Sequence, residues 1–261
     1  MDISISGKRA IVCGSTQGIG KAAAKELASL GANILLIARN EDSLKVVLDE
    51  LPKNQEQRHD YLVADFQQPE ILKDKINIYL QDNSAEILIN NTGGPPGGPI
   101  IDADYHEFEK AMTAHLTCSH ILVQALVPGM KASKYGRIIN IISTSVKIPI
   151  PGLGVSNTTR GAMASWAKTL SQELAPFGIT VNNVLPGFTS TGRLDSLMGS
   201  IASKRQVPFE TVRDEMIASV PAGRFGTPEE IANLIGFLAT PAAAYISGTS
   251  IQVDGARTGA L

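Results

Sequence analysis

The stretch IVCGSTQGIGKAAAKEL, residues 11–27, decides the fold of this chain. It joins a short apolar run to a helix-forming segment through a turn that contains Gly14, Gly18 and Gly20. Glycines in such a turn let backbone N–H groups approach a phosphate, and the N-terminus of the following helix favours its negative charge. The spacing is G-x-x-x-G-x-G and not the G-x-G-x-x-G of ordinary dinucleotide-binding folds. The stretch predicts a strand, a phosphate-binding turn and a helix, with a tight turn that binds no ligand as the alternative.

Further short apolar runs follow this stretch and alternate with helical patterns. The runs are nearly continuous, which is typical of strands covered on both faces. Helices are expected over residues 20–31, where Gly31 ends the pattern, around 69–82, and over 105–132 and 158–176. This alternation predicts an α/β fold, a doubly wound parallel sheet of about seven strands with helices on both faces. The predicted strands are residues 9–13, 33–38, 61–65, 86–90, 137–142, 179–185 and 250–253.

No change of composition divides the chain, so residues 1–261 are expected to form a single domain. The least regular part is 186–225, which follows the sixth predicted strand. Ligands of open α/β sheets bind at the carboxyl edge of the strands. We therefore expect residues 190–220 to be a mobile segment that covers a substrate.

The composition excludes several classes of protein. Hydrophobic residues make up 43% of the chain and charged residues 18%, which argues against disorder, and a net charge of −2 argues against a nucleic-acid partner. No apolar run approaches a membrane span, and the first ten residues lack the core of a secretory signal. We expect a cytoplasmic protein with no membrane partner and no metal site. Cys13 and Cys118 are expected to be buried free thiols and not a disulfide.

The turn at residues 14–20 resembles the cofactor loop of the short-chain dehydrogenases/reductases, and four later segments continue the resemblance in the order of that family. These segments are NNTGG (90–94), GRIINIIS (136–143), ELAPFGITVNNVLPGF (173–188) and ISGTSIQVDGA (246–256). Among family members, the chain is similar to 3-oxoacyl-carrier-protein reductases. The resemblance implies a Rossmann-like fold, a nicotinamide cofactor, a small carbonyl or alcohol substrate, and a homo-oligomer, a dimer or tetramer, paired through the helices at 105–132 and 158–176. Those helices could equally bury their apolar faces within one chain.

The resemblance implies cofactor contacts in four segments of the chain. For Asp65 the alternative is an N-cap of the following helix, and for the proline–glycine pair it is a simple turn. The implied residues are Gly14, Ser15, Thr16, Gln17, Gly18, Ile19 and Gly20 at the pyrophosphate, Asp65 and Phe66 at the adenine, Asn90, Asn91, Thr92 and Gly93 at the adenosine ribose, and Pro186, Gly187, Phe188 and Thr189 at the nicotinamide amide.

The end of the second predicted strand favours NADP(H) over NAD(H). An acidic residue there would accept hydrogen bonds from the ribose 2′-OH of NAD, but this chain has Arg39. A guanidinium can bind a phosphate through two oxygens, and Ser15 lies on the facing loop. The alternative is that Arg39 pairs with Glu41 or Asp42 at the surface. Gln17 argues against NADP(H), because members of the family that use NADP often carry a basic residue at that position.

Four side chains carry the chemistry of the family, and one of the four is present. Ser143 matches the serine that holds the substrate oxygen. By resemblance, Ser156 stands in place of the tyrosine, Arg160 in place of the lysine and His115 in place of the asparagine. None of the five tyrosines is followed by a lysine four residues later, so no shift of register restores the pair. Together with the loop NTGGPPGGP (91–99), this pattern resembles an atypical subgroup of reductase-like proteins.

The replacements leave the proton source open. Ser156 has a short reach and is a weak acid, and Arg160 cannot donate a proton at neutral pH. We expect Arg160 to contact the cofactor ribose, where it could also stabilise an oxyanion, with capping of local backbone or pairing with a nearby acid as the alternative. His115 could be a displaced acid or a structural residue, and Lys147 could lie at the mouth of the site or be solvated. A Ser–His hydrolase would lack a nucleophile elbow. Two functions therefore remain: an NADP(H)-dependent oxidoreductase with an atypical active site, or a catalytically inactive nucleotide-binding sensor or assembly protein.

Overall fold

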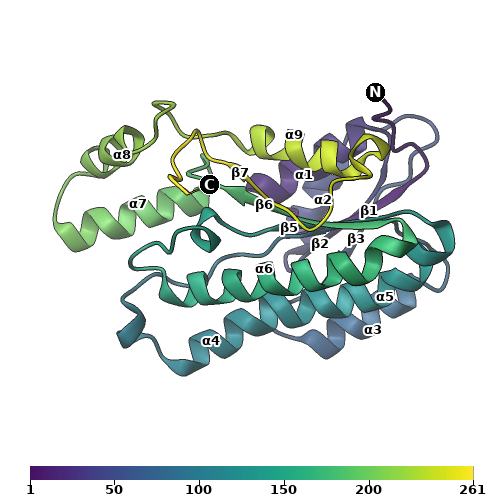
Figure 1. The fold of residues 1–261 in the computed structure, drawn as a ribbon, viewed down its shortest axis with the longest axis horizontal. Coiled ribbons are helices and arrows are strands. Elements are labelled where there is room, and N and C mark those ends of the chain that lie inside the picture. Colours follow the sequence, from purple (N-terminus) through teal and green to yellow (C-terminus); the bar gives the residue numbers. More distant parts are fainter. Residues whose placement is uncertain (261) are drawn as a thin grey trace.

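All seven predicted strands form, and they pair into one parallel sheet in the order β3-β2-β1-β4-β5-β6-β7 (Figure 1). The computed structural model describes residues 1–260. The strand order reverses between β1 and β4, and such a switch point creates the crevice in which open α/β sheets bind ligands. The strands are β1 (Arg9–Cys13), β2 (Asn33–Ala38), β3 (Asp60–Val63), β4 (Ile87–Asn90), β5 (Gly136–Ile141), β6 (Ile179–Pro186) and β7 (Ser250–Val253).

Helices cover both faces of the sheet, as predicted (Figure 1). One face carries α1 (Gly18–Ser29), α2 (Glu41–Glu50) and α9 (Pro228–Ala239). The other carries α3 (Pro69–Tyr79), α4 (Tyr105–Met112), α5 (Cys118–Ser133) and α6 (Gly154–Leu174). Two further helices, α7 (Gly192–Arg205) and α8 (Phe209–Ala218), stand at one end of the sheet.

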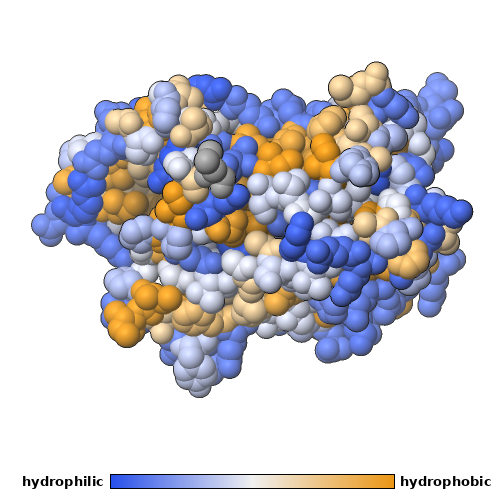
Figure 2. Space-filling model, in the orientation of Figure 1, coloured by the Kyte–Doolittle hydropathy of each residue, from blue (hydrophilic) through white to orange (hydrophobic). Residues whose placement is uncertain are grey.

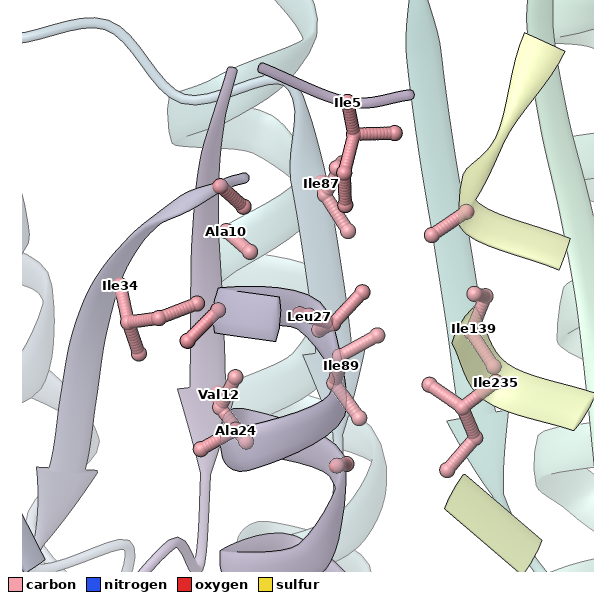
Figure 3. Close-up of a cluster of buried hydrophobic side chains, with 14 of the residues drawn as sticks. Ile5, Ala10, Val12, Ala24, Leu27, Ile34, Ile87, Ile89, Ile139 and Ile235 are labelled. Carbon is pink, nitrogen blue, oxygen red and sulfur yellow. The ribbon is translucent and has the colours of Figure 1, made fainter. Parts of the chain in front are cut away.

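Burial on both faces explains why the strand sequences do not alternate. In β1, Val12 packs in the cluster under α1 and α9, whereas Ile11 packs in the cluster on the opposite face. Figure 3 shows the first cluster, where Val12 and Ile89 from the sheet lie near Leu27 of α1. Gly31 follows α1 with a φ of +98°, the left-handed conformation that ends the helix, as its position in the sequence predicted.

Two predicted segments differ from the structure. The helix expected over residues 105–132 is interrupted by a π-helical turn, Thr113–Thr117, between α4 and α5. The segment 190–220 is more regular than its sequence indicated, because α7 and α8 pack on each other through a small apolar cluster that includes Leu194, Met198 and Val212. That cluster is separate from the two main cores.

Other expectations concern single features of residues 1–260. Cys13 and Cys118 are buried free thiols, as predicted, and burial raises the pKa of each. Within the described residues no helix is long and apolar enough to cross a membrane. The same residues contain no group of three or more histidine, cysteine or acidic side chains arranged to hold a metal ion.

Candidate active site

The turn between β1 and α1 is closely packed around its glycines. Gly14 and Gly18 have φ values of +58° and +53°, which glycine adopts without strain. A Cβ on Gly20 would lie 2.1 Å from the carbonyl oxygen of Gly14. The side chain of Asn91 fixes the turn from the end of β4, because its Nδ2 lies 3.2 Å from the carbonyl oxygens of Cys13 and Gly14. The result is a cradle of bare backbone at the N-terminus of α1, which fits a pyrophosphate.

The other residues of this turn divide between interior and surface. Ser15 is fully buried, and its Oγ donates to the carbonyl oxygen of Ile37 at 3.4 Å, so only its backbone is available for the predicted cofactor contact. Thr16 and Ile19 are half-buried, and Gln17 is exposed.

Arg39 lies at the carboxyl end of β2 and is exposed. It forms no ion pair with any residue from 1 to 260. Glu41, one of its two expected alternatives as a partner, is engaged elsewhere: it pairs with Lys45 at 2.9 Å and accepts a hydrogen bond from the Tyr61 hydroxyl at 2.9 Å. The guanidinium therefore remains available beside the glycine turn.

The segment after β3 holds Asp65 and Phe66, both half-buried. The Asp65 carboxylate accepts a hydrogen bond from the backbone N–H of Gln67 at 3.0 Å. The N-cap of α3 is Gln68, so the alternative role of Asp65 as a helix cap is wrong. The carbonyl oxygen of Phe66 accepts a hydrogen bond from the Cys118 thiol at 3.2 Å.

A ladder of amides crosses the carboxyl half of the sheet. Asn90 Nδ2 donates to Asn140 Oδ1 at 2.9 Å, Asn140 Nδ2 donates to Asn183 Oδ1 at 2.9 Å, and Asn183 Nδ2 donates to Ser250 Oγ at 3.0 Å. The register places these residues side by side on four neighbouring strands. At the β4 end of the ladder, the amide oxygen Asn90 Oδ1 is buried without a partner among the described residues. Sequence reasoning missed Asn140 and Asn183, although each is a polar residue inside an apolar strand.

The turn after β6 is held by the C-terminal part of the chain. The N–H of Gly187 donates to the carbonyl oxygen of Val253 at 2.9 Å, and a Cβ on Gly187 would lie 2.6 Å from the Cβ of Asp254. Phe188 meets Phe225 edge to face, with 6.1 Å between ring centroids. Thr189 is buried and donates from its Oγ1 to the carbonyl oxygen of Gly187 at 3.2 Å.

Arg160 is a buried cation at the carboxyl end of β5. Its exposed fraction is 8%, and it donates one hydrogen bond, from Nη1 to the carbonyl oxygen of Ile141 at 2.9 Å. No carboxylate within the described part of the chain pairs with it. Burial and the neighbouring charge of Arg193 lower its pKa to about 10, so it remains charged at neutral pH. An uncompensated buried charge is costly in a folded protein, which points to an anionic or polar ligand.

The two candidate serines belong to the elements that hold this cation, the end of β5 and α6. Ser156 is half-buried on α6, one turn before Arg160. Ser143 follows β5 and is the N-cap of a 3-10 helix, η3 (Thr144–Val146), where its Oγ accepts a hydrogen bond from the N–H of Ser145 at 3.0 Å. Because a serine hydroxyl has one donor and two acceptor positions, the Ser143 O–H can still donate to a ligand. Lys147 lies just after this helix and is exposed.

His115 is buried in the π-helical turn between α4 and α5. Its Nδ1 hydrogen-bonds the hydroxyl of Thr92, so it joins the helix to the loop after β4. Burial, followed by the positive charge of Arg160, lowers the pKa of His115 to about 2, against the effect of a hydrogen bond with the Gly93 backbone. The imidazole is therefore neutral at pH 7. The expectation that His115 is a displaced acid finds no support in this environment.

One further cation at this site was missed by the sequence reasoning. Arg193, at the start of α7, donates from Nη2 to the carbonyl oxygen of Pro95 at 2.7 Å. This contact joins the α7–α8 segment to the glycine- and proline-rich loop at residues 91–99. No local pattern marks Arg193, since its role depends on a contact with a residue nearly one hundred positions away.

Comparisons with known proteins identify the family of the chain. Residues 14–258 match a family model described as enoyl-(acyl carrier protein) reductase. The chain is 31% identical to the 3-oxoacyl-[acyl-carrier-protein] reductase of Aquifex aeolicus over 98% of this chain and 99% of that protein. It is also 31% identical to a tropinone reductase homolog of Arabidopsis thaliana, over 98% and 94% of the two chains.

A solved structure is also similar to this chain over its whole length. The L-sorbose reductase of Gluconobacter frateurii, complexed with NADPH and L-sorbose, is 30% identical and superposes over the whole of both chains with a TM-score of 0.93. With the parallel sheet, the glycine cradle and the match over residues 14–258, these likenesses establish the family. The chain belongs to the short-chain dehydrogenase/reductase superfamily of NAD(P)-dependent oxidoreductases.

Proposed function

We propose that this protein is an NADP(H)-dependent oxidoreductase for a carbonyl or alcohol substrate, and that a fixed buried cation replaces the tyrosine and lysine of its relatives. One observation carries the proposal: Arg160 is a charged side chain enclosed at the carboxyl end of β5 with a single carbonyl partner. A cation kept there without a counter-ion is suited to a negative charge that develops during a reaction.

The cofactor is proposed to be held along the carboxyl edge of the sheet. The bare backbone of residues 14–20 would contact the pyrophosphate, and Arg39, exposed and without an ion pair in the described chain, would bind a 2′-phosphate. Asn90 supports a ribose contact, because its buried Oδ1 still requires a donor. Residues 91–93 would complete the ribose site, Asp65 and Phe66 would flank the adenine, and residues 186–189 would face the nicotinamide amide.

A bound nicotinamide would supply or accept the hydride in this reaction. In the proposed site, the Ser143 hydroxyl donates a hydrogen bond to the substrate oxygen while its own Oγ is held by the N–H of Ser145. Arg160 would contact the cofactor ribose and would stabilise the negative charge that develops on that oxygen. Neutral His115 positions Thr92 and does not exchange protons. The proton then reaches the oxygen from water, because neither Arg160 nor Ser156 is an effective acid at neutral pH.

Binding and turnover experiments test this proposal. NADPH and NADH are titrated by nicotinamide fluorescence, and NADPH oxidation is then measured with a panel of ketones and 3-oxoacyl thioesters. Arg160→Ala and Ser143→Ala should each lower kcat at least tenfold, whereas Arg58→Ala, at an exposed arginine in the loop before β3, should not. Unchanged kcat in both active-site variants would overturn the proposal.

The second function, a nucleotide-binding protein without turnover, is favoured by one specific observation. His115 is the histidine that the sequence offers as a replacement acid, but its lowered pKa keeps it neutral at pH 7. Tight NADPH binding with no oxidation across the panel would establish this second function. The double variant Ser156→Tyr with Arg160→Lys then tests what is missing, since gained ketone reduction would identify the acid as the lost element.

We also propose a homo-oligomer, a dimer or tetramer, that assembles through α4, α5 and α6. Sedimentation velocity tests this, because a chain that sediments as a monomer at micromolar concentration would exclude it.

A further inference from the structure

A cavity of about 250 Å³ lies between the loop after β5, the end of α8 and the C-terminal tail. Thr144, the residue after Ser143, lines it together with Ser219, Thr258 and Arg257. The opposite wall consists of the isoleucine and proline side chains of residues 148–151. Figures 1 and 2 show the tail turning back beside α7, with apolar surface next to it. The cavity therefore combines an apolar wall with one cation.

Arg257 has no partner for its charge within residues 1–260. Its side chain donates no hydrogen bond there, and its Nε is enclosed without an acceptor. The nearest acid in sequence, Asp254, is already used, because its carboxylate oxygens accept from the backbone N–H groups of Ala256 and Thr258 at 3.1 and 2.8 Å. An arginine that lines a cavity with its donors unpaired is available to an anionic ligand.

The guanidinium of Arg257 is also held in place. Its Cζ lies 4.0 Å from the centroid of the Phe188 ring, and Phe188 in turn meets Phe225 edge to face. A stacked guanidinium keeps its plane fixed, so its N–H groups point along that plane. Phe188 belongs to the turn proposed to face the nicotinamide. The cation therefore stands between the proposed cofactor site and the cavity.

We propose that Arg257 binds a carboxylate of the substrate, so that the substrate is a small oxo acid or the corresponding hydroxy acid. Two parallel hydrogen bonds from a guanidinium match a carboxylate in geometry and charge. The apolar wall would contact the short carbon chain, and the reacting oxygen would reach Ser143, next to Thr144. A volume of about 250 Å³ favours a substrate smaller than a drug-sized ligand. The identity of the substrate rests on the proposed oxidoreductase function. The binding of a carboxylate by Arg257 does not depend on it.

A binding experiment tests the carboxylate site without requiring turnover. Butanoate and butanamide, which differ in charge and hardly in size, are titrated calorimetrically into the protein saturated with NADP⁺. Butanoate should bind the wild type at least tenfold more tightly than butanamide, and Arg257→Gln should remove that preference. Arg257→Lys keeps the charge but cannot form the two parallel hydrogen bonds of a guanidinium, so it should retain part of the preference. Arg58→Gln should retain all of it.

A kinetic experiment uses the same contrast on the reaction. The ratio of kcat/KM for acetoacetate to that for its methyl ester should fall at least tenfold in Arg257→Gln, because a general disturbance of the fold would lower both values together. Equal binding of butanoate and butanamide by the wild type, or an unchanged ratio in Arg257→Gln, would overturn the inference. If no substrate turns over but butanoate binding depends on Arg257, the proposed function fails while the carboxylate site stands.

Discussion

Replacing Arg160 with methionine should make the protein without cofactor at least as stable as the wild type. Burial is the main cause that lowers the pKa of Arg160 from its ordinary value to about 10. A change of this size corresponds to about 3 kcal/mol of unfavourable charging in the folded state. Because the folded pKa lies below the unfolded value, the penalty is fully present at any pH below about 10, decreases progressively as the pH rises towards the unfolded value, and is absent above it.

The substitution also removes a favourable contact. The carbonyl oxygen of Ile141 loses the donor that lies 2.9 Å away, which costs about 1–3 kcal/mol if no water replaces it. The two effects together predict that Arg160→Met changes the free energy of unfolding by between zero and about 2 kcal/mol in the stabilising direction. The same substitution should weaken the binding of NADPH, because the Arg160 side chain is proposed to contact the cofactor ribose.

Arg137→Met is the matched control. Arg137 is 2% exposed, and burial lowers its pKa as well. Its side chain, however, donates to three carbonyl oxygens, those of Thr240, Gly136 and Gly178, and stacks on the Tyr135 ring at 4.1 Å. Because these partners satisfy the guanidinium, Arg137→Met should destabilise the protein by about 2 kcal/mol or more.

Urea unfolding at one protein concentration, with and without NADPH, measures both effects. At a hundredfold excess over Kd, NADPH should stabilise the wild type by about 2.7 kcal/mol, and a tenfold weaker Kd in Arg160→Met would remove about 1.4 kcal/mol of that. If Arg160→Met unfolds more than 1 kcal/mol more easily than the wild type and keeps the full stabilisation by NADPH, then Arg160 is a structural residue and the reasoning is refuted.

Three further predictions concern the cofactor and the proton. Gly20→Ala places a methyl group 2.1 Å from the carbonyl oxygen of Gly14, so it should weaken NADPH binding in fluorescence titrations at least tenfold, whereas Gly129→Ala in α5, where the space is open, should not. Arg39→Glu should weaken NADPH binding at least tenfold and leave NADH binding nearly unchanged, and an equal loss for both cofactors would contradict its proposed contact with the 2′-phosphate. Because the pKa of His115 is near 2, His115→Asn should leave the shape of the kcat/KM profile between pH 5 and 9 unchanged; an inflection near pH 6.5 that vanishes in the variant would show that the histidine titrates.

The sheet could be predicted from the sequence because its strands are buried on both faces. Continuous apolar runs such as NILLIA at β2 are distinct from the helical patterns around them, and three strands begin and end at the predicted residues. The interruption of the helix at Thr113–Thr117 could not be predicted in the same way. A π-helical turn changes the backbone hydrogen bonding without requiring a glycine or proline, so no residue type in the sequence marks it.

The places of the candidate residues in the fold could be predicted from the sequence, but their surroundings could not. A position near the active site made His115 a reasonable acid, whereas its protonation depends on burial and on the charge of Arg160. Ser15 was placed on the correct turn, but the direction of its side chain depends on a carbonyl of β2. Arg193 and Arg257 come from segments that pack on the site only in the folded chain. Such properties arise from tertiary contacts and leave no trace in local spacing.

The replacements proposed for the site are consistent with one another as physical chemistry. A phenol that titrates near 10 needs a neighbouring ammonium to work at neutral pH, so the lysine of the family loses that purpose once the tyrosine is absent. Arg160, which we propose takes its place, keeps its charge at neutral pH, and the same charge helps to lower the pKa of His115. In the proposed site Arg160 then stays charged near neutral pH, and His115 stays neutral there. Such a site can stabilise an oxyanion at every working pH but cannot deliver a proton from a side chain, which is why the choice between turnover and mere binding depends on whether water can reach the substrate oxygen.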